Sequence, residues 1–230
     1  MNEAVAVATE SRARFPRVQW IGLAWLAVYL PTYQTAYGAR NFLFLCNIGV
    51  ILTAAGLIAR NRLLLSSQAV AAPVIALAWV LDVGWKLATG EFLYGATAYM
   101  WDPAFPLFAR LLSLYHIAWP LLLWWMLRRV GYDPRGWPLQ AGIAALAMIA
   151  GRWLAPATEN INFAWTDPFW GRQLGPTPLH LLTCWGVLSG VAYGATHLLL
   201  RRVFSRPADP LRASAPASAS VSKPADGSVP

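Results

Sequence analysis

The stretch 105-FPLFARLLSLYHIAWPLLLWWMLRR-129 decides the fold class of this protein. It is long enough to cross a bilayer as a helix, yet it carries Arg110 and His116 inside an apolar run. Ionisable side chains at membrane depth are costly and usually face a bundle interior, a cavity or a partner. At 100° per residue the two side chains share one face of the helix. We therefore predict that other helices cover this face.

The composition of the whole chain extends this interpretation. Of the 230 residues, 57% are hydrophobic and only 12% are charged, which is about half the charged fraction usual in soluble domains. The sequence lacks segments of about ten residues in which apolar and polar residues alternate, the pattern that would indicate a membrane β-barrel. We therefore predict an all-α, polytopic membrane helix bundle whose partners are membrane lipids. The net charge of +8 would suit nucleic acid, but its placement indicates membrane topology instead, and no nucleic-acid partner is expected.

Apolar runs divide the chain into six predicted transmembrane helices. They cover residues 20–37, 41–58, 69–88, 105–129, 138–154 and 179–200. Together they form a transmembrane domain over residues 18–204. Residues 1–17 are predicted to be a cytoplasmic N-terminal arm, and the Ala/Ser/Pro-rich residues 205–230 a disordered cytoplasmic tail.

The basic residues predict the orientation of these spans. The N-terminal arm, the second-to-third loop, the fourth-to-fifth loop and the C-terminal tail hold 13 of the 18 Lys and Arg residues. Positively charged loops stay on the cytoplasmic side, so both termini are predicted to be cytoplasmic. The expected location is a bacterial cytoplasmic membrane.

Polar residues inside the spans form a candidate site in the outer half of the bundle. Its candidate catalytic residues are Cys46, Asn47, Thr53, Asp82 and His116. Counted from the outer ends of the spans, Cys46, Asn47 and Asp82 lie roughly 8 Å deep, whereas Thr53 and His116 lie roughly 16 to 18 Å deep. The depth therefore makes Thr53, as well as Cys46, a candidate partner of His116.

Each of these residues also has a structural interpretation. Asp82 either belongs to the site or forms an internal ion pair with Lys86, one turn away, or with Arg110. Cys46 shares a small-residue face with Thr53, which favours helix packing. His116 is either functional or a core histidine bonded to Thr53 or to a backbone carbonyl.

Candidate binding residues complete the predicted site. They are Lys86, Arg110, Asn160 and Asn162. No zinc-type Cys/His spacing and no haem or nucleotide motif occurs, so neither a metal nor another cofactor is predicted.

Other residues of the spans are interpreted as structural. A disulfide between Cys46 and Cys184 is disfavoured, because disulfides within hydrocarbon are uncommon. His180 and His197, near the two ends of the last span, are interpreted as interfacial. Gly186, Gly190 and Gly194 form one small-residue face on that span. Such a face predicts close helix packing, within the bundle in preference to a homodimer.

Four short motifs resemble one known family. They are 41-NFLFLCNIG-49, 113-SLYHIAWPLLLW-124, 159-ENINFAW-165 and 175-GPTPLHLL-182. They resemble the YwaF-type bacterial integral membrane proteins, which are six-span proteins of unassigned function. A more distant similarity is to six-span lipid hydrolases and acyltransferases that pair an early Thr or Cys with a later His. That similarity implies Cys46 as nucleophile and His116 as base, with Asn47 where the bacterial pattern often has Asp.

Three hypotheses for function follow. The first is a lipid-directed hydrolase or acyltransferase with an outward-facing site, in which Cys46 or Thr53 is the nucleophile, His116 the base, and Asn47 and Asp82 orient them. The second is a solute or proton-coupled transporter that uses Asp82, Lys86, Arg110 and His116, although no inverted repeat is visible. The third is a non-catalytic membrane scaffold whose glycine face binds a partner or a second copy.

Overall fold

The computed structural model describes residues 18–204, and these residues form helices and loops without a strand. The predicted arm 1–17 and tail 205–230 lie outside the described residues. The elements are α2 (Gln19–Tyr37), η1 (Ala39–Leu43), α3 (Leu45–Ile58), α4 (Arg62–Thr89), η2 (Ala98–Met100), α5 (Leu107–Leu112), α6 (Tyr115–Val130), α7 (Gly136–Leu154), η3 (Ala157–Glu159), η4 (Ile161–Phe163), α8 (Thr177–Gly186), η5 (Val187–Ala192) and α9 (Tyr193–Phe204).

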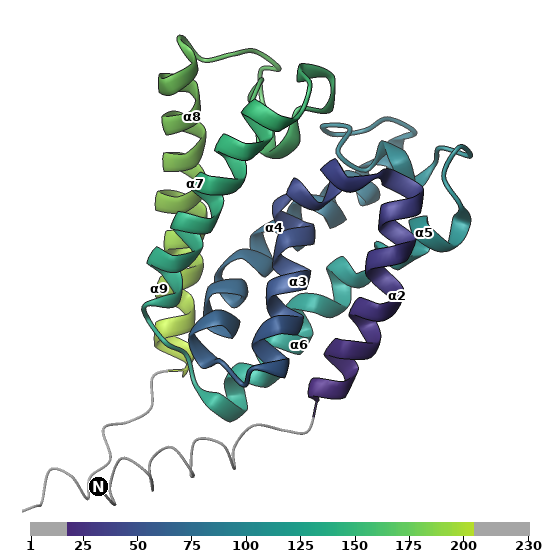
Figure 1. Ribbon diagram of the computed structural model, residues 1–230. Helices are drawn as coiled ribbons and strands as arrows, with labels where there is room; N and C mark the ends of the chain where they lie inside the picture. The colour runs from purple at the N-terminus through teal and green to yellow at the C-terminus, as the bar shows by residue number, and fades with distance from the viewer. Residues whose placement is uncertain (1–17, 205–230) are drawn as a thin grey trace, which may run out of the picture.

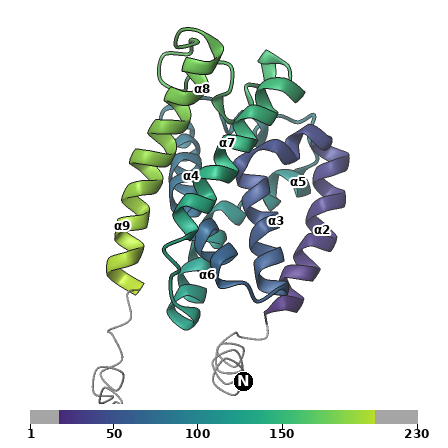
Figure 2. The same cartoon turned by 60° about the vertical axis from the view of Figure 1, so that its left-hand side comes forward.

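The long helices run up and down through one bundle. The start of α2 and the end of α9 lie at the lower end of the bundle in both views (Figures 1 and 2). The long loops from α4 to α5 and from α7 to α8 lie at the upper end. The described part of the chain is therefore all-helical, as predicted, with its two ends on the same side.

The central helix is α4, which packs against α3, α6, α7 and α9. It begins at Arg62, seven residues before the predicted start at Ala69, because the Asn61 side chain accepts a hydrogen bond from Leu64 N at 3.0 Å and caps the helix. In the added turns the side chains from Leu65 to Gln68 are buried, although Ser66, Ser67 and Gln68 are polar. The predicted boundary was wrong because these polar residues resemble a loop in sequence.

The stretch that was predicted as one helix over 105–129 consists of α5 and α6. At the junction the backbone hydrogen bonds tighten, since Ser113 N donates to Arg110 O and His116 N donates to Ser113 O. Such bonds span three residues instead of four. A short, tighter turn therefore separates α5 from α6 just before His116.

Two segments are long and apolar enough to cross a membrane, α4 and the combined segment 107–130, and α3 is a shorter apolar helix. Many large apolar side chains are exposed on the outside of the bundle, and several polar side chains are buried inside it beside an apolar core. Large exposed apolar residues include Leu77, Leu87, Leu121, Leu146, Ile149, Trp153 and Val191, and buried polar residues include Gln68, Gln140 and His180.

The last predicted span is α8 and α9 joined by the π-helix η5. A Cβ atom added at Gly186 or at Gly190 would meet no atom within 4 Å, and one at Gly194 would meet only Ser189 O, at 3.9 Å. The prediction that this glycine face packs within the bundle was therefore wrong. The buried face of η5 carries Ser189 instead.

Candidate functional site

The upper half of the bundle contains a cluster of tyrosines around Asn47. The side-chain oxygen Oδ1 of Asn47 accepts hydrogen bonds from the hydroxyls of Tyr29, at 2.5 Å, and Tyr115, at 3.1 Å. Its Nδ2 donates to Asn41 O at 2.5 Å. These three bonds join α2, α3, α6 and the short helix η1. Asn47 is thus the polar centre of this part of the core.

Cys46 lies at the edge of the same cluster. Its thiol donates to Asn47 Oδ1 at 3.6 Å, and the residue is partly exposed. Cys46 and Cys184 are both free thiols, which agrees with the expectation that they form no disulfide.

His116 is buried and held by its neighbours. Its Nδ1 lies 2.7 Å from Ser113 O. Because a carbonyl oxygen only accepts hydrogen bonds, Nδ1 carries the proton and Nε2 keeps a lone pair. The ring stacks on Trp79, with centroids 5.0 Å apart, and on Tyr115, with centroids 4.2 Å apart. Tyr115 therefore contacts both His116 and the Asn47 centre.

Thr53 does not bond to His116. Its hydroxyl donates to Gly49 O at 2.7 Å, one turn earlier in α3, and accepts from Trp119 Nε1 at 2.8 Å. Of the two partners considered for a core His116, the backbone carbonyl is the correct one, and it is Ser113 O. The bond to Thr53 is not formed, and its hydroxyl bonds to Gly49 and Trp119 instead. Thr53 ties α3 to α6.

Asp82 forms no ion pair with Lys86 or Arg110, contrary to that prediction. Its Oδ1 accepts from the backbone N–H groups of Leu93, Tyr94 and Gly95, and its Oδ2 accepts from the N–H and the hydroxyl of Thr97, at 2.6 to 3.3 Å. Backbone donors of the loop after α4 satisfy the carboxylate. Asp82 therefore anchors this loop to α4.

The two basic candidates lie near the same upper end. Lys86 donates from Nζ to Gly90 O, at the end of its own helix, and its ammonium lies 4.5 Å from the centroid of Phe92. Arg110 donates from Nη1 to Met100 O at 3.0 Å, while its Nε is buried without a partner. Lys86 and Arg110 thus bond to backbone carbonyls, and neither bonds to the Asp82 carboxylate.

The two asparagines of the loop before α8 bind backbone. Asn160 accepts from the N–H groups of Trp165 and Thr166 and so holds its own loop. Asn162 accepts from Leu45 N at 2.8 Å and donates to Leu43 O at 2.8 Å. It therefore joins this loop to the break between η1 and α3.

His180 was predicted to be interfacial, but it is fully buried. Its Nδ1 accepts from Leu174 N at 3.1 Å, and its Nε2 lies 3.0 Å from Phe163 O, to which it donates. His180 holds the loop before α8 as Asp82 holds the loop after α4.

Sequence reasoning missed a second polar cluster in the lower half of the bundle. Gln68 Nε2 donates to Gln140 Oε1 at 3.2 Å, which joins α4 to α7. Tyr132 and His197 share a hydrogen bond of 2.7 Å between Oη and Nδ1. The signal in the sequence was the polar triplet 66–68, which is unusual inside an otherwise apolar helix.

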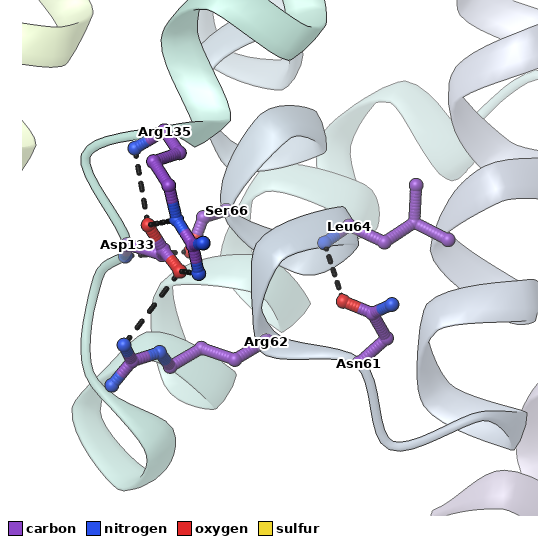
Figure 3. Close-up of polar contacts among 6 residues, drawn as sticks. All are labelled: Asn61, Arg62, Leu64, Ser66, Asp133 and Arg135. Carbon is purple, nitrogen blue, oxygen red and sulfur yellow. Dashed lines mark hydrogen bonds and ion pairs between the residues drawn. The ribbon is translucent and has the colours of Figure 1, made fainter.

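Asp133, also in the lower half of the bundle, binds residues at the start of α4 and before α7 (Figure 3). Its carboxylate lies 2.8 Å from Arg135 Nη2 and 3.6 Å from Arg62 Nη2, and its backbone N–H donates to Ser66 Oγ. Hydrogen bonds from Arg135 keep the pKa of Asp133 below its ordinary value, although partial burial opposes this shift. The loop before α7 is thereby bound to the start of α4.

Within residues 18–204 no group of three or more His, Cys, Asp or Glu side chains is arranged to hold a metal ion. The candidate site thus consists of Cys46, Asn47, Tyr115 and His116, connected by contacts in that order.

The resemblance of the four short motifs to the YwaF-type proteins stays a prediction. Comparison of the chain with protein-family models, with curated proteins and with solved structures found no match.

Proposed function

We propose that the chain is a six-span integral protein of a bacterial cytoplasmic membrane, with both termini in the cytoplasm. The many large apolar side chains exposed on the helices support this placement, because extensive exposed apolar surface suits lipid better than water. The basic loops support the orientation. The connections from α3 to α4 and from α6 to α7 lie at the lower end (Figure 1). These connections and the adjoining helix ends contain Arg60, Arg62, Arg128, Arg129 and Arg135.

We propose further that the protein is a lipid-directed hydrolase or acyltransferase with Cys46 as its nucleophile. The observation that carries this proposal is the continuous contact from Cys46 through Asn47 and Tyr115 to His116. Asn47 and Tyr115 would position the thiol. His116 would be the base, because its Nε2 lone pair is available.

In the proposed reaction the sulfur of Cys46 bonds to the acyl carbon of a lipid ester, and the bond from that carbon to the alcohol oxygen breaks. The thiol proton passes to His116 Nε2 and then to the departing alcohol. The oxygen of water or of a second hydroxyl compound then bonds to the acyl carbon, the carbon–sulfur bond breaks, and the proton of that hydroxyl passes through His116 to the sulfur. Among residues 18–204 there is no direct hydrogen bond between Cys46 and His116, so this proposal requires the two side chains to approach each other when substrate binds.

Trapping of a thioester tests this proposal. Membranes containing the full chain would be incubated with a phospholipid that carries an alkyne-labelled acyl chain, and acylated protein would be detected before and after hydroxylamine. We expect hydroxylamine-sensitive label on the wild type and on the Cys184→Ala control, no label on Cys46→Ala, and at least about tenfold slower labelling of His116→Gln. Equal labelling of Cys46→Ala and the wild type, or no label on either, would overturn the proposal.

A second candidate function, a membrane scaffold, is favoured by the unoccupied space at Gly186 and Gly190. A second copy could place a helix against this face. Cross-linking of the wild type, Gly190→Ile and the control Gly84→Ile in membranes tests this, because Gly84 also has open space but lies on α4. Loss of the dimer in Gly190→Ile alone supports the scaffold, and a monomeric wild type rejects it.

A further inference from the structure

Two buried hydrogen-bond donors without acceptors lie where α2 ends beside α5. The Nε–H of Arg110 has no partner, although Nη1 of the same side chain donates to Met100 O. The hydroxyl of Tyr37, the last residue of α2, is also buried without a partner. Buried polar groups are nearly always hydrogen-bonded, and each unpaired one is costly. This pair therefore indicates a missing acceptor.

The two groups belong to one place in the fold. The elements α2 and α5 are in contact, and Tyr37 packs against Tyr99, with ring centroids 5.7 Å apart, next to the Met100 carbonyl that accepts from Arg110. The ion pairs formed within residues 18–204 involve Arg40, Arg62 and Arg135, so no carboxylate of these residues neutralises Arg110. One positive charge and two unused donors match an oxyanion, because its oxygens only accept hydrogen bonds.

The surface beside Arg110 is apolar. Leu107 lies three residues before Arg110 in α5, hence on its side of that helix, and is 60% exposed. Leu114, two residues beyond the end of α5, is 46% exposed. Tyr37 packs against Phe105, with ring centroids 4.8 Å apart. An anion that also presents a long apolar chain would fit this combination better than a free ion would.

We propose that Arg110 and Tyr37 bind the phosphate of an anionic phospholipid at the outer end of the bundle, with an acyl chain lying along Leu107 and Leu114. The guanidinium binds phosphate oxygens through two N–H groups, and the phenol adds a third donor. This inference rests on the proposed membrane placement. It names anionic phospholipids as the substrate class of the proposed acyl transfer.

Binding is to be measured in the Cys46→Ala background, in which the proposed acyl transfer cannot occur. Failure to bind lipid is then distinct from failure of Cys46 to react. The full chain in neutral detergent would be titrated with dioctanoyl phosphatidylglycerol, dioctanoylglycerol and inorganic phosphate, and bound ligand would be counted by native mass spectrometry. Arg110→Gln, Arg110→Lys and Tyr37→Phe would be compared with Arg172→Gln, which alters an exposed arginine in the loop before α8.

We expect phosphatidylglycerol to bind at least about tenfold more tightly than dioctanoylglycerol, because charge-assisted hydrogen bonds to the phosphate are lost in the latter. Arg110→Gln should weaken binding by about tenfold or more, Arg110→Lys and Tyr37→Phe by less, and Arg172→Gln not at all. Tyr37→Phe keeps the packing of the ring, so its effect reports on the hydroxyl.

Three results would overturn the proposal. They are equal binding of phosphatidylglycerol and dioctanoylglycerol, full binding by Arg110→Gln, and inorganic phosphate binding as tightly as the lipid. The last result would assign the site to a free anion.

Discussion

Asp82 shows how a buried carboxylate at an apparent ion-pair position can have a different partner. In sequence it stands one turn from Lys86, but in the structure five donors from the following loop surround it. Backbone N–H groups compete well with a lysine for the Asp82 carboxylate, because a lysine must lose both its hydration and the freedom of its flexible side chain to bind there. The position of donors in a loop cannot be read from helical spacing.

Asp82→Ala is therefore expected to destabilise the protein by about 3 kcal/mol, because it leaves buried N–H groups without an acceptor. Asp82→Asn keeps one oxygen and should cost less. Unfolding in detergent gives the stability, and limited proteolysis shows whether the loop 90–97 becomes the first site of cleavage. Lys86→Ala, whose residue is partly exposed, is the control and should change little. Equal stability of Asp82→Ala and Lys86→Ala would contradict the anchoring role.

Asp133 gives a prediction for pH. Its pKa is lower in the folded protein than the ordinary value of 3.8, chiefly through Arg135. A lowered folded pKa contributes stability above the unfolded pKa, and this contribution is lost as the pH falls through the folded pKa. The wild type should thus lose more stability than Asp133→Asn as the pH falls from 5 to below about 3.8, and the two should converge in strong acid. Thermal unfolding across this range checks it, and parallel curves would contradict it.

At the scale of the helices, close approaches depend on single glycines. A Cβ atom at Gly49 would lie 2.5 Å from the Trp119 ring, whereas one at Gly84 would meet nothing within 4 Å. Gly49→Ala is expected to lower stability by about 1 to 3 kcal/mol through overpacking. Gly84→Ala should be neutral or stabilising by up to about 1 kcal/mol, because alanine favours a helix. Unfolding of both variants in one detergent tests this, and a Gly84→Ala variant as unstable as Gly49→Ala would contradict it.

The helices themselves followed largely from apolar run length. The predicted 20–37 and 138–154 differ from α2 and α7 by at most two residues at each end. The errors arose where polar residues are buried, as at Ser66 to Gln68, or where a helix is interrupted, as before His116. Run length carries no information on either feature, because both depend on which helix lies opposite.

The candidate site was predictable only in part. Cys46, Asn47 and His116 do lie in one cluster, but Tyr115, which connects them, was not singled out because a tyrosine in an apolar span resembles ordinary core. Thr53 was proposed from its depth alone. Depth along the membrane does not determine which way a side chain points around its helix, and this angle decides the partner.

For the whole molecule, the proposed membrane orientation predicts which loops face the outside of the cell and which face the cytoplasm. In a Cys46→Ala/Cys184→Ala background, Glu91→Cys should react with an impermeant maleimide from outside intact spheroplasts. Arg128→Cys should react only after lysis, because it lies at the opposite end of the bundle. Both residues are exposed, so burial cannot explain a difference. The reverse pattern would contradict the proposed orientation.

The bridge made by Asn162 has a consequence for biogenesis. This side chain completes the hydrogen bonding of Leu43 and Leu45, which are made more than a hundred residues earlier. During synthesis, the hydrogen bonds of Leu45 N and Leu43 O with Asn162 therefore cannot form until the loop before α8 has been made. A nascent chain halted before residue 162 should be cleaved by quality-control proteases near Leu43 to Leu45, and Asn162→Ala should make the completed protein susceptible at the same place.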